Sequence, residues 1–300
     1  MQRLKDFFLS TRPQFFPGIA VPVALGASVA WHTHSEFHPV RFIISLAAAI
    51  LFHGGMNVLN DYFDFKNGSD NINTSALTPF TGGSRFIQNK RITPTETLSF
   101  GLTLVLLGSV AGLYLALTIN PLLIVIGALG LLIGFFYSAP PVFLAGRGLG
   151  EAAVGLTFGV LTVLGAYLVQ TGELGAQAFV SSLPMAFLIA ALLYINEFPD
   201  YEADKKAGKR TLVVRLGPER GRWGILVILG GAYSSIVIGA ATGALPRASL
   251  IAALSIVTAL PGAIGLIRNY KGGPALIPSI KSVILAHLST GILLIASNLI

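Results

Sequence analysis

The chain contains no cysteine among its 300 residues, and charged residues make up only 11% of it. The lack of cysteine excludes disulfide bonds, cysteine zinc sites and thiolate catalysis. A soluble globular domain carries about 25% charged residues, so the shortage of charge argues against a soluble protein. With 53% hydrophobic residues, the composition is typical of a helical protein that crosses a membrane several times.

Apolar segments of sufficient length to cross a bilayer recur along the whole chain. They lie near residues 14–31, 40–60, 97–118, 121–138, 149–169, 179–197, 223–243, 248–267 and 280–299. The pattern predicts an all-α fold with about nine transmembrane helices, and only Ile119 and Asn120 separate the third segment from Pro121, which indicates a tight helical hairpin. We expect one domain, residues 1–300, with a central cavity that opens to the cytoplasmic side.

The positions of the basic residues predict how the chain lies in the membrane. A net charge of +7 would suggest a nucleic-acid partner in a soluble protein, but in a membrane protein the placement of the charges matters more. With the N-terminus in the cytoplasm, eighteen of the twenty Lys and Arg lie inside, and only Arg41 and Arg247 lie outside. We therefore expect an integral protein of the cell inner (plasma) membrane, with the lipid bilayer as a partner and no nucleic acid.

Acidic residues are scarce, and more than half of the 13 lie in two short patches. The first patch, Asn57–Asp70, contains Asp61, Asp64 and Asp70, and the second, Asn196–Asp204, contains Glu197, Asp200, Glu202 and Asp204. Each patch ends an apolar segment and opens a long loop, near 65–95 and 198–222, on the predicted cytoplasmic side. Carboxylates are costly beside lipid, so each one needs a partner or a function. Long loops are often functional lids, which is the role that we expect for both.

Helical spacing places part of each patch on one face. Asn57, Asp61 and Asp64 share one face of the first helix, with Asn60 beside them and Asp70 displaced from that face, and Asn196, Asp200 and Asp204 share one face of the second. Oxygen ligands of this kind suit Mg²⁺, which commonly bridges carboxylates to the phosphates of a substrate. The metal ligands that we predict are Asn57, Asp61, Asp64, Asn196, Asp200 and Asp204. For one patch alone, helix capping with local ion pairs is an equal alternative; two matching patches, each followed by basic residues, favour the metal site.

Cations near the patches complete a site for a diphosphate group, whose developing negative charge needs them beside the metal. The candidates are Arg12, Lys66, Arg85, Arg147, Lys205 and Lys209, of which we expect two to four to contact a ligand.

Here the residues resemble a known family. The stretch Asn60–Asp70, read NDYFDFKNGSD, is similar to the first Asp-rich motif of the UbiA superfamily of intramembrane prenyltransferases, and Asn196-x-x-x-Asp200-x-x-x-Asp204 to the second. The resemblance covers most of the first 220 residues, whereas the last three apolar segments match only in hydropathy. The form Asp-x-x-Asp-x-x-x-Gly-x-Asp and the loop Thr81–Arg85 resemble the menaquinone branch, which contains the 1,4-dihydroxy-2-naphthoate prenyltransferases.

The resemblance implies a Mg²⁺-dependent enzyme that transfers a polyprenyl group from a polyprenyl diphosphate to an aromatic acceptor, with 1,4-dihydroxy-2-naphthoate favoured. It implies catalytic roles for Asp61, Asp64, Asp200 and Asp204. It implies substrate-binding roles for Arg12, Asn57, Asn60, Lys66, Arg85, Tyr137, Arg147, Asn196, Lys205 and Lys209. It places Tyr137 and Tyr194 either beside a carbocation or, equally, as interfacial aromatic residues. A packing role is expected for His53 and His287, with the acceptor pocket as the alternative for His53. The acceptors of other branches stay open: 4-hydroxybenzoate, homogentisate, chlorophyllide, haem or a lipid.

Two alternatives come from other classes of protein. A cation-coupled transporter would use the acids as ion ligands, but transporters tend to place ionisable residues near the middle of the bilayer. In this chain the acids lie at one edge of the apolar segments. A non-catalytic scaffold that binds a lipid or quinone would not need both acid patches.

Overall fold

The structure, a computed structural model, describes residues 1–74 and 76–300, and every regular element in that part is a helix. The all-α prediction is therefore confirmed. The α-helices are α1 (Gln2–Ser10), α2 (Pro17–His34), α3 (Pro39–Asn67), α4 (Ser69–Ile72), α5 (Pro94–Thr118), α6 (Leu122–Ser138), α7 (Gly150–Val154), α8 (Thr162–Thr171), α9 (Ala176–Lys206), α10 (Leu212–Leu216), α11 (Pro218–Gly221), α12 (Gly224–Ala241), α13 (Ile256–Arg268) and α14 (Ile277–Ser297). Four short 3₁₀ segments are η1 (Pro13–Phe15), η2 (Ala145–Arg147), η4 (Arg247–Ser255) and η5 (Pro274–Leu276), and the π-helical turn η3 (Gly155–Leu161) joins α7 to α8.

Within the described residues, seven helical segments are long and apolar enough to cross a membrane. They are Pro39–Asn67, Pro94–Thr118, Gly150–Thr171, Ala176–Lys206, Pro218–Ala241, Arg247–Arg268 and Pro274–Ser297. The pair Gln2–Phe15 and Pro17–His34, bent by 57°, makes an eighth if it counts as one span. Helix α6 is equally apolar but has only 17 residues, so the count of nine stays a prediction. The protein is an integral membrane protein.

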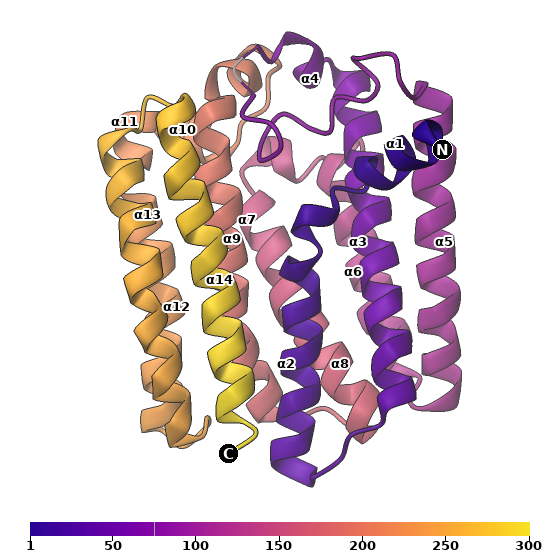
Figure 1. Cartoon of the computed structure of the whole chain (residues 1–300), viewed down its shortest axis with the longest axis vertical. Coiled ribbons are helices and arrows are strands. Elements are labelled where there is room, and N and C mark those ends of the chain that lie inside the picture. Colours follow the sequence, from indigo (N-terminus) through magenta and orange to yellow (C-terminus); the bar gives the residue numbers. More distant parts are fainter. Residues whose placement is uncertain (75) are drawn as a thin grey trace.

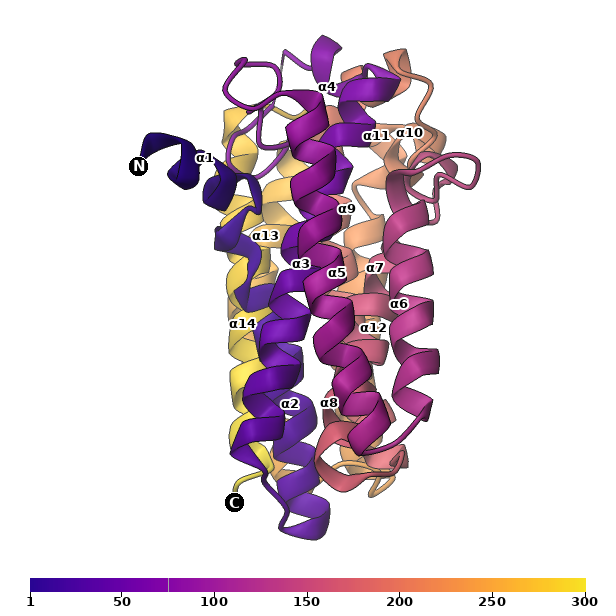
Figure 2. The ribbon, with the colours of Figure 1, turned by 90° about the vertical axis from the view of Figure 1, so that its right-hand side faces the viewer.

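The long helices stand beside one another, and their connections gather at two ends (Figures 1 and 2). The short helices α4, α10 and α11 lie at the same end, and the α5–α6 hairpin turns at the opposite end (Figure 1). Since α4 follows α3 and α10 follows α9, both acid patches end their helices at one end of the bundle. Acids at one end, and not at mid-length, count against the transporter alternative.

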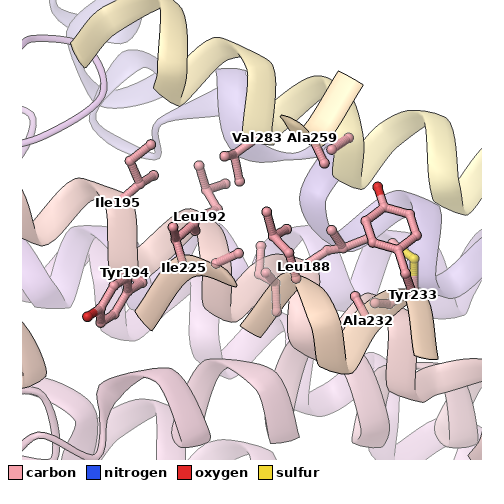
Figure 3. Close-up of a cluster of buried hydrophobic side chains, with 14 of the residues drawn as sticks. Leu188, Leu192, Tyr194, Ile195, Ile225, Ala232, Tyr233, Ala259 and Val283 are labelled. Carbon is pink, nitrogen blue, oxygen red and sulfur yellow. The ribbon is translucent and has the colours of Figure 1, made fainter. Parts of the chain in front are cut away.

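A buried cluster of apolar side chains anchors α9 against the last helices. Leu188 and Ile195 of α9 pack with Ile225 of α12, Ala259 of α13 and Val283 of α14 (Figure 3). This packing covers most of the length of α9, which continues through the internal prolines Pro184 and Pro199. The second acid patch therefore extends from a helix that the core holds in place.

Tyr194 belongs to this cluster, and its hydroxyl donates a hydrogen bond to the backbone oxygen of Gly221 at 2.5 Å. Its side chain is 1% exposed and lines neither of the two cavities described below. Of the two roles expected for Tyr194, this position in the core argues against the one beside a carbocation. A tyrosine in an apolar helical segment fits a core position as well as a cavity wall. The sequence pattern does not distinguish these two positions.

Candidate active site

The two acid patches meet around one buried lysine. Lys209, in the loop after α9, places its Nζ 3.1 Å from Oδ1 of Asp64 and 3.8 Å from Oδ1 of Asp204. Only 11% of the lysine side chain is exposed. Burial lowers the pKa of Lys209, but the carboxylates of Asp64 and Asp204 raise it by more, so the net pKa is above its usual value. Lys209 is therefore a charged bridge between the end of α3 and the end of α9.

A second cation comes from the N-terminal segment. Arg12, between α1 and η1, forms an ion pair with Asp61, and its Nη2 also donates to Oδ1 of Asn60 at 3.1 Å. The amide of Asn60 donates in turn to Oδ2 of Asp64 at 3.0 Å and to the hydroxyl of Ser138 on α6 at 2.7 Å. Asn60 thus holds Arg12, Asp64 and α6 in one polar network.

The loop between α4 and α5 covers the acids. Asn73 donates to Oδ1 of Asp200 at 2.8 Å, and Thr81 and Gly82 lie beside the same carboxylate. The backbone N–H of Ser84 donates to Oδ1 of Asp61 at 3.2 Å. One loop therefore contacts both acid patches, each through a direct hydrogen bond.

Asp70 also reaches this cluster, although the sequence placed it away from the helical face. Gly68 ends α3 with φ 85°, a left-handed conformation that favours glycine, and the turn directs α4 and Asp70 back over the site. A Cβ atom at Gly83 would lie 2.6 Å from Oδ2 of Asp70 and 3.0 Å from Oδ1 of Asp61, so only glycine fits between them. Burial, together with the charges of Asp64 and Asp61, raises the pKa of Asp70 to about 8.

The cluster holds more carboxyl groups than cationic side chains. Five carboxylates gather there, from Asp61, Asp64, Asp70, Asp200 and Asp204, and the cations inside it are Arg12 and Lys209. Oδ2 of Asp61 and Oδ1 of Asn196 are buried with no hydrogen-bond partner in the described part of the chain. Buried oxygens of this kind need a partner, and a cation would supply it.

The donor set fits a magnesium ion that shares its ligands with a substrate. No three acidic or histidine side chains in residues 1–74 and 76–300 converge tightly enough to hold a metal by themselves. Mg²⁺ usually binds through one or two carboxylates, several waters and substrate phosphates, so an incomplete protein shell is expected for it.

Two cavities lie side by side and share part of their lining. The first, about 260 Å³, is lined by Asp64, Asp70, Asp200, Asp204 and Lys209. The second, about 650 Å³, is lined mainly by apolar side chains of α3, α5, α6 and the helices α7 to α8. The residues that line both cavities include Arg12, His53, Asn57, Asn60, Tyr137 and Phe158. A polar chamber therefore continues into an apolar one of more than twice its volume.

Four of the predicted cations lie outside this arrangement. Lys66, Arg147 and Lys205 are exposed, and neither they nor Arg85 line a cavity. Lys66 and Lys205 lie over the rings of Tyr62 and Tyr201. Arg147 donates to the backbone oxygen of Pro141 at 2.9 Å, and Arg85 to that of Asp70 at 2.8 Å. Arg85 and Arg147 thus hold loop backbone.

Of the other predicted residues, Asn57, Asn60, Tyr137, Asn196 and Arg12 all line the first cavity. Asp61 lies behind Arg12 and Gly83 and does not line it. Sequence reasoning missed Asn73, which the structure brings to Asp200. Asn73 follows Asp70 by about one helical turn, and this spacing is the sequence feature that could have predicted its place beside the acids.

The fold and the site define a helical integral membrane protein with an acidic, cation-binding chamber at one end and an apolar cavity behind it. The chain belongs to the UbiA prenyltransferase family, whose model matches residues 19–275.

Individual relatives extend over different shares of the chain. It is 30% identical to the 1,4-dihydroxy-2-naphthoate octaprenyltransferase of Mycobacterium tuberculosis, over 96% of this chain and 94% of that protein. It is 32% identical to the human UbiA prenyltransferase domain-containing protein 1, over 72% of this chain and 62% of that protein. The chain therefore spans less than two thirds of the human relative's length.

A solved structure shares the fold. The UbiA homolog from Archaeoglobus fulgidus, bound to GPP and Mg²⁺, superposes with a TM-score of 0.70 at 18% identity, over 97% of this chain and 99% of that one. At this identity the likeness supports the architecture of the helices.

Proposed function

We propose that the protein transfers a polyprenyl group from a polyprenyl diphosphate to an aromatic acceptor, with 1,4-dihydroxy-2-naphthoate as the favoured acceptor. The carrying observation is the acid cluster around Lys209 and Arg12, at the mouth of the 650 Å³ apolar cavity. A diphosphate needs the polar chamber and a long hydrocarbon tail needs the apolar one, so a polyprenyl diphosphate fits both at once. The naphthoate octaprenyltransferase among the relatives supports the acceptor.

The proposed metal ligands are those of the sequence prediction: Asn57, Asp61, Asp64, Asn196, Asp200 and Asp204. Bound Mg²⁺ would neutralise charge on the diphosphate as it becomes the leaving group. Asp70 lies close enough to Asp61 to join this set. The excess of carboxylates over cations in the chamber supports the assignment.

The residues of the chain have separate tasks in the reaction. The allylic C–O bond breaks, its electron pair leaves with the diphosphate, and Lys209 and Arg12 donate hydrogen bonds to the departing oxygens. The acceptor ring then bonds to the allylic carbon and loses a proton, or CO₂ from its carboxylate. Tyr137 and Phe158 line the junction of the cavities, where their rings flank the cation. Asn73 and the segment from Thr81 to Ser84, which contact the acids, exclude water, which would otherwise capture the cation.

We further place the acid end of the helices in the cytoplasm and treat residues 1–300 as one domain, with the loops near 65–95 and 198–222 as lids. The eighteen-to-two distribution of Lys and Arg supports this orientation in the plasma membrane.

The function is tested with purified protein, one radiolabelled polyprenyl diphosphate and a panel of acceptors. We expect prenylated 1,4-dihydroxy-2-naphthoate in the presence of Mg²⁺, and no product after EDTA treatment until Mg²⁺ is restored. Product with another member of the panel, and none with the naphthoate, would reassign the acceptor. Absence of product with every acceptor would refute the proposal.

The apolar cavity predicts how donor length is limited. Gly130 on α6 lines it, and a Cβ added there would meet no atom within 4 Å, so a larger side chain would project into open space. Gly130 lies seven residues from Tyr137, or about 10 Å along the helix axis. An extended carbon chain advances about 1.3 Å per bond, so an isoprene unit of four bonds is about 5 Å long. A leucine at position 130 should therefore meet tails longer than about two isoprene units.

Gly130→Leu is expected to lower kcat/KM for geranylgeranyl diphosphate by about tenfold or more, because overpacking costs about 1–3 kcal/mol. Turnover of dimethylallyl diphosphate should be retained. Gly230→Leu on α12 is the matched control, because its Cβ also meets open space but the residue lines neither cavity. Equal losses for short and long donors would contradict the placement of the tail.

A further inference from the structure

His287 is a buried polar residue that neither the fold nor the reaction described above uses. It lies on α14 with 2% of its surface exposed, and it lines the first cavity. Neither Nδ1 nor Nε2 has a hydrogen-bond partner among the described residues. The sequence favoured a packing role for this histidine, but a packing histidine is normally hydrogen-bonded.

Other polar side chains of α14 do have hydrogen-bond partners within the protein. The hydroxyl of Ser282 donates to the oxygen of Thr258, that of Ser289 to Leu285 at 2.7 Å, and that of Thr290 to Ala286 at 2.7 Å. These polar side chains satisfy themselves within the protein. The imidazole of His287, which has one donor and one acceptor when neutral, is left for a ligand.

Ile284, His287 and Leu288 of α14 line one part of the first cavity, which we call the α14 arm. Helices α2 and α9 pack against α14, and Gly18 of α2 and Ile189 of α9, which lie close to each other, line the same cavity. No residue of α14 lines the second cavity. In Figure 1, α2 stands between α14, which lines the first cavity and not the second, and α3, which lines the second cavity with Ser45, Ala48 and Phe52.

We propose that this arm binds the aromatic acceptor and that His287 forms a hydrogen bond with a hydroxyl group on its ring. The inference rests on the proposed function, which needs a second substrate beside the prenyl donor. The apolar walls suit the faces of a ring, and the two unpartnered nitrogens suit a hydroxyl, which can donate and accept. The donor tail occupies the other cavity, so both substrates reach the junction at the same time.

The experiment compares His287→Leu, His287→Gln and the control Thr290→Val with the wild type, using farnesyl diphosphate and 1,4-dihydroxy-2-naphthoate. Thr290 is a fully buried polar residue of the same helix, but it has its own partners and lines neither cavity. Loss of one hydrogen bond in a buried site weakens binding by about tenfold. We expect His287→Leu to raise the KM for the naphthoate by about that factor while the KM for the diphosphate stays unchanged. His287→Gln should recover part of the affinity, and Thr290→Val should match the wild type.

Thermal unfolding separates a binding role from a structural one. Because His287→Leu removes an unsatisfied buried group, the unliganded variant should unfold at the same temperature as the wild type or a higher one. A lower unfolding temperature together with an unchanged KM for the naphthoate would show a packing histidine and overturn the inference. A parallel rise in both KM values would place His287 at the donor tail and overturn it as well.

Equilibrium binding keeps the inference testable apart from turnover. The fluorescence of the naphthoate gives its dissociation constant for wild type and His287→Leu without any donor. If the wild type forms no product but the dissociation constant still rises about tenfold in the variant, the proposed function fails and the ring-binding arm stands. If product forms and the two dissociation constants agree, the function stands and the role of His287 is refuted.

Discussion

Asparagine in place of Asp64 is expected to lower kcat/KM for the prenyl transfer by about a thousandfold, the scale seen when one preorganised electrostatic contact at a reacting centre is lost. Asp64 is the carboxylate at which the network converges, since it contacts both Lys209 and Asn60. The substitution keeps the size and the acceptor oxygen but removes the charge that a metal and Lys209 require. Steady-state kinetics with labelled donor, at saturating Mg²⁺, measures the loss.

Asp6→Asn is the matched control for this prediction. Asp6 is also a buried acid, and its Oδ2 accepts a hydrogen bond from Nε of Arg91 at 3.0 Å, but it lines neither cavity. Its substitution should reduce stability and leave kcat/KM close to that of the wild type. Near-normal turnover by Asp64→Asn, in protein that elutes and unfolds like the wild type, would refute the assignment of the acid cluster.

Lys209→Met is expected to have the second largest effect, and on stability as well as on activity. The variant leaves Asp64 and Asp204 facing each other without their shared cation, and breaking a buried ion pair by removing one partner costs about 3–5 kcal/mol. Thermal unfolding in EDTA should therefore occur at a clearly lower temperature than for the wild type. Mg²⁺ should restore more stability to this variant than to the wild type, because the metal neutralises the buried carboxylates that have lost their lysine.

Lys205→Met provides the comparison, since Lys205 is exposed and lies over the ring of Tyr201. It should leave both the unfolding temperature and the response to Mg²⁺ unchanged. An equal response of the two variants would mean that the net charge of the loop, and not the bridge made by Lys209, sets the effect.

Helical periodicity predicts which side chains share a face within one helix, and it predicts nothing beyond the end of that helix. Asp61, Asp64, Asp200 and Asp204 were placed on helix faces, and the structure brings those faces together. The same rule applies to the cations that lie outside the site. Lys66 follows Asp64 by two positions, a rotation of about 200° in an α-helix, so the two side chains point apart. Lys205 is likewise rotated about 100° from Asp204.

The remaining features depend on turns and on packing between distant segments. Asp70 reaches the site because Gly68 reverses the chain, and a glycine in the sequence does not specify where the following residues go. His287 faces a cavity because α14 packs beside α2, which joins residues more than 260 positions apart in the sequence. The local sequence around His287 does not distinguish a histidine that lines a cavity from one that packs in the core.

The bridge made by Lys209 also bears on the order in which the protein is synthesised and assembled. Arg12 is already made when Asp61 leaves the ribosome, but Lys209 follows Asp64 by about 145 residues. During that interval the amides of Asn60 and Asn67 are able to donate hydrogen bonds to Asp64, but Lys209 is not there to neutralise its charge. We therefore expect the end of α3 to stay at the membrane surface, where water can solvate the carboxylate. Closure of the chamber therefore follows the insertion of α9. The acids at the end of α3 become buried only after Lys209 has been synthesised.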